Sequence, residues 1–204
     1  MIVVSWNCRG LGHPSKINFL KDLIKSKKPD ILLIQDTKLS SQEMEGIIGK
    51  SRIYEGLAIS TMGASGGIST IWEKMKWKLQ QHTRKDHWIN TKLENIETGG
   101  TKSIYNIYST NHYKDKETCW ETLKESIGDD REDNILVGGD LNLILKAKEK
   151  RGGNFLLDQN RETLEEIMEQ SNLLDIPPKN GKYTWDNRRI GKANIKEILD
   201  RILI

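Results

Sequence analysis

The segment Asn134-Ile135-Leu136-Val137-Gly138-Gly139-Asp140-Leu141-Asn142 decides the fold, because it joins a buried strand to a polar end. Its apolar residues follow one another without alternation, which is typical of a strand that is covered on both faces of a sheet. A carboxylate, Asp140, and a carboxamide, Asn142, stand where the strand leaves the core. Ligands of α/β sheets gather at such strand ends. The segment therefore predicts both a sheet and a site at its edge.

The same pattern recurs along the chain. Three further apolar runs carry a polar residue at the corresponding place, namely Val3-Val4-Ser5-Trp6 with Asn7, Leu32-Leu33-Ile34-Gln35 with Asp36, and the last run with Asp200. A single such residue is usually a turn residue or a helix cap. Four together favour one oxygen-rich edge. Three carboxylates and two carboxamides suit Mg²⁺, or Mn²⁺ as the alternative, and do not suit zinc.

The remaining segments alternate between strand and helix patterns. We expect helices at 14–28, 40–50, 114–127 and 160–171, and strands at 2–7, 31–34, 54–59, 68–72, 76–81, 88–93, 103–108, 134–138 and from about 195. Ser40 and Glu43 form a capping-box pattern, and Thr98-Gly99-Gly100-Thr101 is typical of a hairpin turn. Because no linker or repeat interrupts this order, residues 1–204 are expected to form one α/β domain.

Composition limits the classes of protein. Of the 204 residues, 36% are hydrophobic and 30% charged, and the net charge of +3 permits a nucleic-acid partner without requiring one. The two cysteines, Cys8 and Cys119, form no CxxC pair, so a zinc finger or a thioredoxin-like site is unsupported. We expect reduced thiols in an intracellular protein of the nucleus or cytoplasm, without a membrane span. A monomer is assumed.

The two ends of the chain also carry an expectation. Residues Met1 to Trp6 lack the pattern of a signal peptide, and the final run Ile198 to Ile204 stops inside an apolar strand. Domains seldom end with a strand edge left unpaired. We therefore expect the domain to be C-terminally truncated.

Four short motifs carry a family resemblance, in the order Ser5-Trp6-Asn7-Cys8-Arg9-Gly10, Gln35-Asp36-Thr37-Lys38, Gly139-Asp140-Leu141-Asn142 and Leu199-Asp200-Arg201. The chain resembles the endonuclease/exonuclease/phosphatase superfamily from Ile2 to Ile204. Tyr183-Thr184-Trp185 and Lys150-Arg151-Gly152-Gly153 resemble more closely the apurinic-type endonuclease domain of plant LINE (non-LTR) retrotransposons. The resemblance implies a four-layered sandwich of two packed mixed β-sheets flanked by helices. It also implies Mg²⁺-dependent hydrolysis of a phosphodiester bond in DNA.

The resemblance also implies roles for individual residues. Asp140 is expected to orient or deprotonate the attacking water, and Asn142 to support the transition state. Tyr108 is expected to contact the phosphate, although it can equally be a packed strand aromatic. Asp200 is expected to orient a catalytic histidine. Asn7 is expected to place the phosphate and to contribute to the metal site.

Two departures from the family pattern bear on activity. Asp36 stands where the family has Glu as its main Mg²⁺ ligand, and its side chain is one methylene shorter. Since Mg²⁺ tolerates little deviation from about 2.0–2.1 Å, we expect weaker metal affinity. The closing Ser-Asp-His motif of the family has no counterpart up to Ile204. His112 lies close after Tyr108, but we interpret it as a loop residue.

Basic and aromatic residues near these motifs are candidates for nucleic-acid binding. The candidates are Lys150, Arg151, Trp185, Arg188 and Arg189, with Lys146, Lys148 and Lys192 nearby. Beside a DNA backbone they would give salt-dependent affinity that is blind to sequence. The alternative is a solvated loop for the cations and a core or hairpin position for the tryptophan.

Three functional readings follow from this sequence. The first is a Mg²⁺-dependent retroelement-type DNA endonuclease domain, weakened or inactive as truncated. The second is a catalytically dead retroelement remnant that keeps only the fold or weak DNA binding. The third is a small-molecule or lipid phosphatase of the same superfamily.

Overall fold

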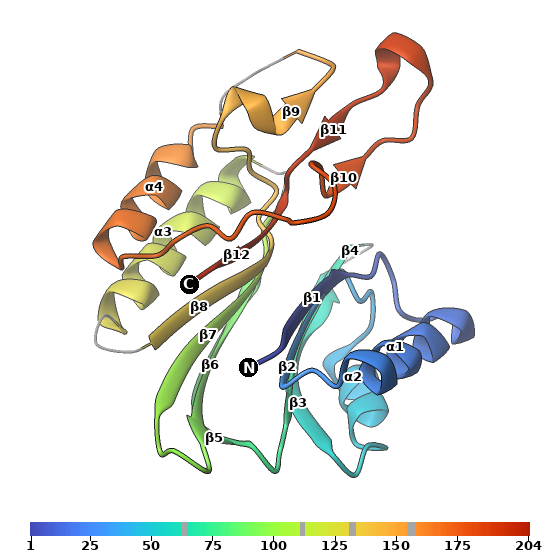
Figure 1. Ribbon diagram of the computed structural model, residues 1–204, viewed down its shortest axis with the longest axis vertical. Helices are drawn as coiled ribbons and strands as arrows, with labels where there is room; N and C mark the ends of the chain where they lie inside the picture. The colour runs from blue at the N-terminus through green and yellow to red at the C-terminus, as the bar shows by residue number, and fades with distance from the viewer. Residues whose placement is uncertain (63–64, 111–112, 131–133, 155–157) are drawn as a thin grey trace.

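Two mixed β-sheets face each other, and helices cover the outer face of each one (Figure 1). This arrangement comes from a computed structural model that describes residues 1–62, 65–110, 113–130, 134–154 and 158–204. The order of layers is helix, sheet, sheet, helix, and the expected α/β sandwich is therefore confirmed. Within the described residues, no helix is both long enough and apolar enough to cross a membrane.

The first sheet has the strand order β1-β2-β4-β3. Its strands are β1 (Val3–Asn7), β2 (Ile31–Gln35), β3 (Tyr54–Met62) and β4 (Ser65–Glu73). β1 and β2 are parallel, with Asn7 opposite Gln35, and the other neighbours are antiparallel. β2 is buried along its whole length, as its unbroken apolar run predicts.

The second sheet has the strand order β12-β8-β7-β6-β5. Its strands are β5 (Trp77–Lys85), β6 (Trp88–Asn95), β7 (Thr101–Tyr108), β8 (Asn134–Asp140) and β12 (Asp200–Leu203). β7 and β8 are parallel, and the remaining pairs are antiparallel. The expected turn between β6 and β7 is present, with Gly99 in the left-handed region at a φ of 70°.

The helices begin where their caps predict. In α1 (Pro14–Lys27), Pro14 opens the helix after a His13 cap, and in α2 (Ser41–Ile48) both hydrogen bonds of the Ser40–Glu43 capping box form. α1 and α2 cover the first sheet. α3 (Tyr113–Asp129) and α4 (Arg161–Gln170) cover the second sheet (Figure 1).

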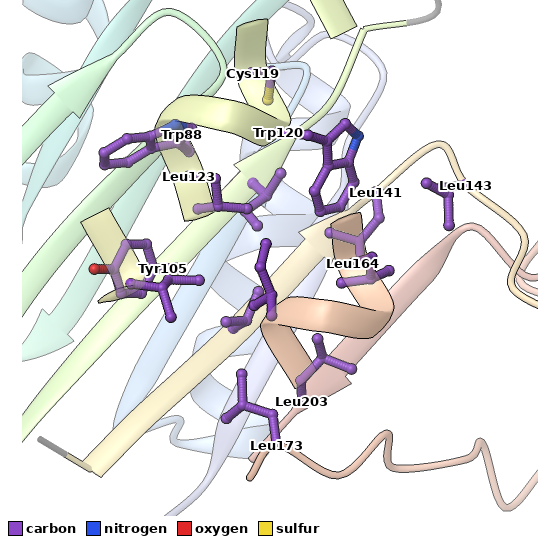
Figure 2. Packing of buried hydrophobic residues seen from close by; sticks show 14 of the residues in the cluster. Trp88, Tyr105, Cys119, Trp120, Leu123, Leu141, Leu143, Leu164, Leu173 and Leu203 are labelled. Atoms are coloured by element: carbon purple, nitrogen blue, oxygen red, sulfur yellow. The ribbon is translucent and has the colours of Figure 1, made fainter. Parts of the chain in front are cut away.

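Three apolar clusters hold the layers together. Residues of both sheets meet between them, at Ile31, Leu33, Trp72, Trp77, Leu93, Ile104 and Leu136. A second cluster lies between the first sheet and its helices. A third packs the second sheet against α3 and α4, where Trp88, Tyr105, Trp120 and Leu164 interdigitate (Figure 2). Each sheet is thus fixed on both faces, which makes its strand ends a rigid platform.

Two glycines allow β8 to lie close to the opposite sheet and to its neighbour β7. A Cβ atom on Gly138 would lie 2.6 Å from Leu33 Cδ1 of the opposite sheet. Gly139 has a φ of 137°, and a Cβ there would lie 2.0 Å from the carbonyl oxygen of Ile107. Because only glycine fits both positions, the sequence Gly138-Gly139 fixes how Asp140 leaves the core.

A small third sheet takes up the chain before the last strand. We expected one strand from about Ile195, but the chain first pairs at β11 (Lys196–Glu197) and then changes sheet to enter β12. β11 lies between β9 (Lys150–Arg151) and β10 (Trp185–Asp186), and this sheet extends beyond the ends of the large ones (Figure 1). Strands of two residues have too short a sequence period to be recognised. Short helical turns, η1 (Ala147–Glu149) and η2 (Gly191–Ala193), complete the described elements.

Candidate active site

The strand registers bring the predicted polar residues to one edge of the two sheets. Tyr108 pairs with Asp140 between β7 and β8, and Asp140 pairs with Asp200 between β8 and β12. Asn7 ends β1 in the other sheet, and its Nδ2 donates a hydrogen bond of 2.6 Å to Asp140 Oδ2. This bond joins the ends of the two sheets across 133 residues of sequence.

Asp140 lies at the centre of the group and is only 5% exposed. Its carboxylate also accepts a hydrogen bond of 3.0 Å from the backbone N–H of Asn142. Burial raises the pKa of Asp140, and the negative charge of Asp36 raises it further. The hydrogen bonds from Asn142 and Asn7 and the positive charge of Arg9 oppose that effect, but the pKa stays above its ordinary value. Asp140 is therefore a stronger base than an exposed aspartate.

Asp36 follows β2 directly and is 6% exposed. Its φ of 52° is in the left-handed region, where the backbone of a residue other than glycine is strained. The carboxylate accepts a hydrogen bond of 3.0 Å from the backbone N–H of Gly66, and the Tyr108 hydroxyl also donates to it. Burial raises the pKa of Tyr108, and the charges of Asp36 and Asp140 add to the rise. Tyr108 thus stays protonated as a donor.

Asp200 stands beside Asp140 on the neighbouring strand. Burial and the negative charge of Asp140 raise the pKa of Asp200 to about 6, against a lowering by the Thr184 hydroxyl and Arg9. Thr184 Oγ1 accepts hydrogen bonds of 3.0 Å from the backbone N–H groups of both Leu199 and Asp200. The groups that perturb Asp200 in the described part of the chain include no histidine.

Asn142 is held by its backbone and by its side chain. Its φ is 47°, and its side-chain Nδ2 donates to the carbonyl oxygen of Ser109, just after β7. A cavity of about 1060 Å³ opens beside Asn142 and Tyr108, lined also by the turn between β5 and β6 and by the start of α3. The predicted site therefore borders a space that can hold a substrate group.

Arg9 and Thr184 belong to this site, although the sequence reasoning assigned them no role. Arg9 has a φ of 49°, and its backbone N–H donates to Asn7 Oδ1 at 3.2 Å. Both residues lie inside motifs that carried the family resemblance. Neither has a local pattern that predicts a contact with Asp140 or Asp200, so only the motif itself could have drawn attention to them.

The oxygen donors fit a hard divalent cation. Asp36 offers a carboxylate and Asn7 a side-chain carbonyl, with Asp140 close to both. Across the described ranges, no group of three or more His, Cys, Asp or Glu side chains lies close enough together to hold a metal ion. Mg²⁺ is commonly held by one or two carboxylates while water and phosphate oxygens complete its shell, so this donor set suits Mg²⁺ rather than zinc.

The predicted nucleic-acid residues lie on the small third sheet and its loops. Arg151, Arg188 and Arg189 are exposed, and Trp185 is partly buried in β10. The Nζ of Lys150 lies 2.6 Å from Glu197 Oε1, and both side chains are 17% exposed. Its charge is thus neutralised within the sheet. His112 lies outside the described residues.

Comparisons with known proteins agree with this architecture. The Endonuclease/Exonuclease/phosphatase family pattern matches residues 4–203, whereas a search of curated proteins found no match. An AP endonuclease from Leishmania major superposes with a TM-score of 0.77 at 15% identity, covering 98% of this chain and 77% of that one. The 3'-5' exonuclease NExo from Neisseria meningitidis gives 0.76 at 16% identity, covering 100% and 86%.

The endonuclease domain of TRAS1, a telomere-specific non-LTR retrotransposon, gives a TM-score of 0.70 at 13% identity, covering 98% of this chain and 83% of that one. At these identities the solved structures establish the fold alone. The family pattern, in contrast, spans nearly the whole sequence and includes all the residues at the sheet edge. The chain therefore belongs to the Endonuclease/Exonuclease/phosphatase family.

Proposed function

We propose that this chain is a Mg²⁺-dependent phosphodiesterase that nicks DNA, of the kind found in retroelement endonuclease domains. The observation that carries the proposal is the hydrogen bond between Asn7 and Asp140. It unites the polar ends of both sheets into one acidic group beside a cavity. The names of the similar structures, which include AP endonucleases and a retrotransposon endonuclease, support the same class of reaction.

Asp140 is the proposed base for the attacking water. Its raised pKa favours uptake of the water proton while the water oxygen bonds to phosphorus and the P–O bond to the leaving oxygen breaks. Asn7 holds one carboxylate oxygen and the Asn142 backbone holds the other, so the carboxylate cannot rotate freely. A fixed base retains its aim at the phosphorus throughout the reaction.

Tyr108, Arg9 and Asp36 serve the phosphate side of the reaction in this proposal. The Tyr108 hydroxyl stays protonated and donates to Asp36 here, and in this proposal it would turn to a phosphate oxygen when the Asp36 carboxylate binds the cation. Arg9 carries positive charge beside both strand ends and offsets the charge of the incoming phosphate. Asp36 and Asn7 Oδ1 would hold the cation, which when bound would neutralise negative charge on the phosphate and on the leaving oxygen.

Two features weaken this chemistry. Asp36 has the shorter carboxylate, and its side chain is already bonded to the Gly66 backbone and to Tyr108. We propose that its affinity for Mg²⁺ is correspondingly low. Asp200 is proposed to orient a histidine, and Thr184 positions it. In the part of the chain that the structure describes, the side chains that shift its pKa are Asp140, Thr184 and Arg9.

DNA is the proposed partner, and its backbone is the proposed contact. Arg151 lies in β9 and Arg188 and Arg189 follow β10, and all three are exposed, so they are the proposed contacts to the DNA backbone. Arg188 is held by a hydrogen bond of 2.7 Å from its backbone N–H to Asp186, which fixes the loop that carries it. Lys150 pairs with Glu197, so the proposal relies on the three arginines instead.

A plasmid-nicking assay with Mg²⁺ tests the proposal, with Asp140→Ala as the matched variant. Nicking that requires Mg²⁺ and is lost in the variant is the expected result. Retained DNA gel shift without nicking would instead support a catalytically dead remnant. Hydrolysis of a phosphoinositide but not of DNA would support a small-molecule phosphatase of the same family.

A further inference from the structure

A buried lysine contacts the loop that carries Asn142. Lys116 lies in the first turn of α3, and its side chain is 7% exposed. Its ammonium group donates a hydrogen bond of 2.7 Å to the backbone carbonyl oxygen of Asn142 and also pairs with the carboxylate of Asp158. Lysine is almost never buried without a partner, so the position of this charge is fixed by these two acceptors.

The contact with Lys116 lowers the pKa of Asp158. Burial by itself would raise the pKa of Asp158, but the hydrogen bond and the charge of Lys116, with further bonds from Asn160, keep the pKa below its ordinary value. Asp158 therefore stays ionised beside Lys116. Buried ion pairs of this kind are often no more stabilising than apolar residues of the same volume. Stability alone is thus a weak reason for placing the pair here.

Asn142 is the residue that the lysine constrains. Its left-handed φ of 47° is a sparsely populated conformation for a residue other than glycine, and such conformations persist only where the surroundings fix them. Three contacts do so, from its N–H to Asp140, from its side chain to Ser109, and from Lys116 to its carbonyl. The hydrogen bond from Lys116 is the contact that fixes the carbonyl group of Asn142.

We propose that Lys116 is a positioning residue, which holds Asn142 in its left-handed conformation and thereby keeps the carboxylate of Asp140 aimed for phosphodiester hydrolysis. This inference rests on the proposed function for its catalytic consequence. Its structural part, the dependence of Asn142 on Lys116, stands on the contacts alone. Lys116 is not itself directed at a substrate, since both of its acceptors belong to the protein.

The test removes the lysine together with its charge partner. In the double variant Lys116→Met with Asp158→Asn both charges are lost, and no buried charge is left unpaired. The control pair is Lys124→Met with Glu166→Gln, which removes another lysine–carboxylate pair between α3 and α4 that does not contact Asn142. Thermal unfolding checks that each variant folds.

NMR of the Asn142 amides is the readout that does not need activity. The backbone and side-chain amides of Asn142 should shift and exchange faster with solvent in the double variant, and remain as in the wild type in the control pair. Unchanged Asn142 signals in the double variant would overturn the proposal, whether or not the wild type cleaves DNA.

Kinetics then test the catalytic consequence. A misplacement on the order of 1 Å costs roughly 100-fold in rate, so kcat for nicking should fall about 10- to 100-fold in the double variant with KM nearly unchanged. In the control pair, kcat should stay within about 3-fold of the wild type. A double variant with disturbed Asn142 signals but full kcat would overturn the positioning role. A wild type without nicking would overturn the proposed function, while the NMR result on Asn142 would still decide the contact.

Discussion

Replacing Asn7 by alanine should slow the reaction by a definite amount. The substitution removes the 2.6 Å hydrogen bond from Asn7 to the buried carboxylate of Asp140 and leaves most of β1 unchanged. Because this bond already exists before the reaction, its own free energy does not set the rate, and what the variant loses is the fixed aim of the carboxylate. A misplacement on the order of 1 Å costs roughly 100-fold in rate, so kcat should fall by about 10- to 100-fold.

The same substitution should change the dependence of the rate on pH. Burial raises the pKa of Asp140, and the hydrogen bond from Asn7 partly opposes this rise. Without the bond, the pKa of Asp140 rises further, so the base is protonated at a higher pH. The acidic limb of the rate profile should therefore move to higher pH in Asn7→Ala.

The assay is single-turnover nicking of a supercoiled plasmid at saturating Mg²⁺ across pH 5 to about 9, a range that covers carboxylate titration. Ser5→Ala is the control, because Ser5 lies two residues earlier in β1 and bonds to Gln35 instead of Asp140. An Asn7→Ala rate within about 2-fold of the Ser5→Ala rate, or an acidic limb that stays in place, would refute the reasoning, since loss of the carboxylate's aim should cost at least about 10-fold.

Four further perturbations have defined outcomes. Asp200→Asn should raise Tm in EDTA above pH 6. The pKa of Asp200 is raised to about 6 in the folded chain, so its ionised form destabilises the fold above that pH, whereas below about pH 4 the residue is protonated and this destabilisation disappears. The gain is up to about 3 kcal/mol, and equal Tm values for the two proteins at pH 7.5 would contradict it. Asp36→Glu should lower the Mg²⁺ concentration that gives half-maximal nicking, because the longer side chain advances the carboxylate; no gain on Mg²⁺ titration counts against this explanation. Arg188→Ala with Arg189→Ala should weaken DNA binding and reduce the slope of log K against log salt by about 2, measured by fluorescence anisotropy, and an unchanged slope would remove these residues from the interface. Gly139→Ala should lower the free energy of unfolding by about 3 kcal/mol or more in urea, since its Cβ would lie 2.0 Å from a backbone carbonyl oxygen; a loss below about 1 kcal/mol would show that β8 can shift.

Local sequence patterns predicted most of the regular elements. The apolar run of β2, the proline that opens α1 and the Ser40–Glu43 capping box depend on residues a few positions apart. Their free energies come largely from neighbours in sequence, which is why pattern and propensity suffice to find them. The same holds for the polar residues at strand ends, since each marks the place where its own strand leaves the core.

Local sequence patterns did not predict the shortest strands or the charge pairs. β11 has two residues and takes its place from pairing with β9 and β10, so an apolar run from Ile195 predicted one strand where the chain changes sheets. Lys150 belonged to a basic cluster in the sequence, and only pairing of β9 with β11 brings Glu197 against it. In both cases the deciding partner lies 10 or more residues away.

The sequence by itself determined which residues end the strands of this protein and that oxygen donors dominate them. The tertiary structure decided that Asn7 reaches Asp140, that Thr184 holds Asp200, and that Lys116 holds the loop of Asn142. These contacts form because two sheets pack face to face and helix α3 covers one of them, at distances in sequence where no local pattern operates. Closing such long loops is favourable only once the whole core is buried, so the geometry of the site is a property of the complete fold.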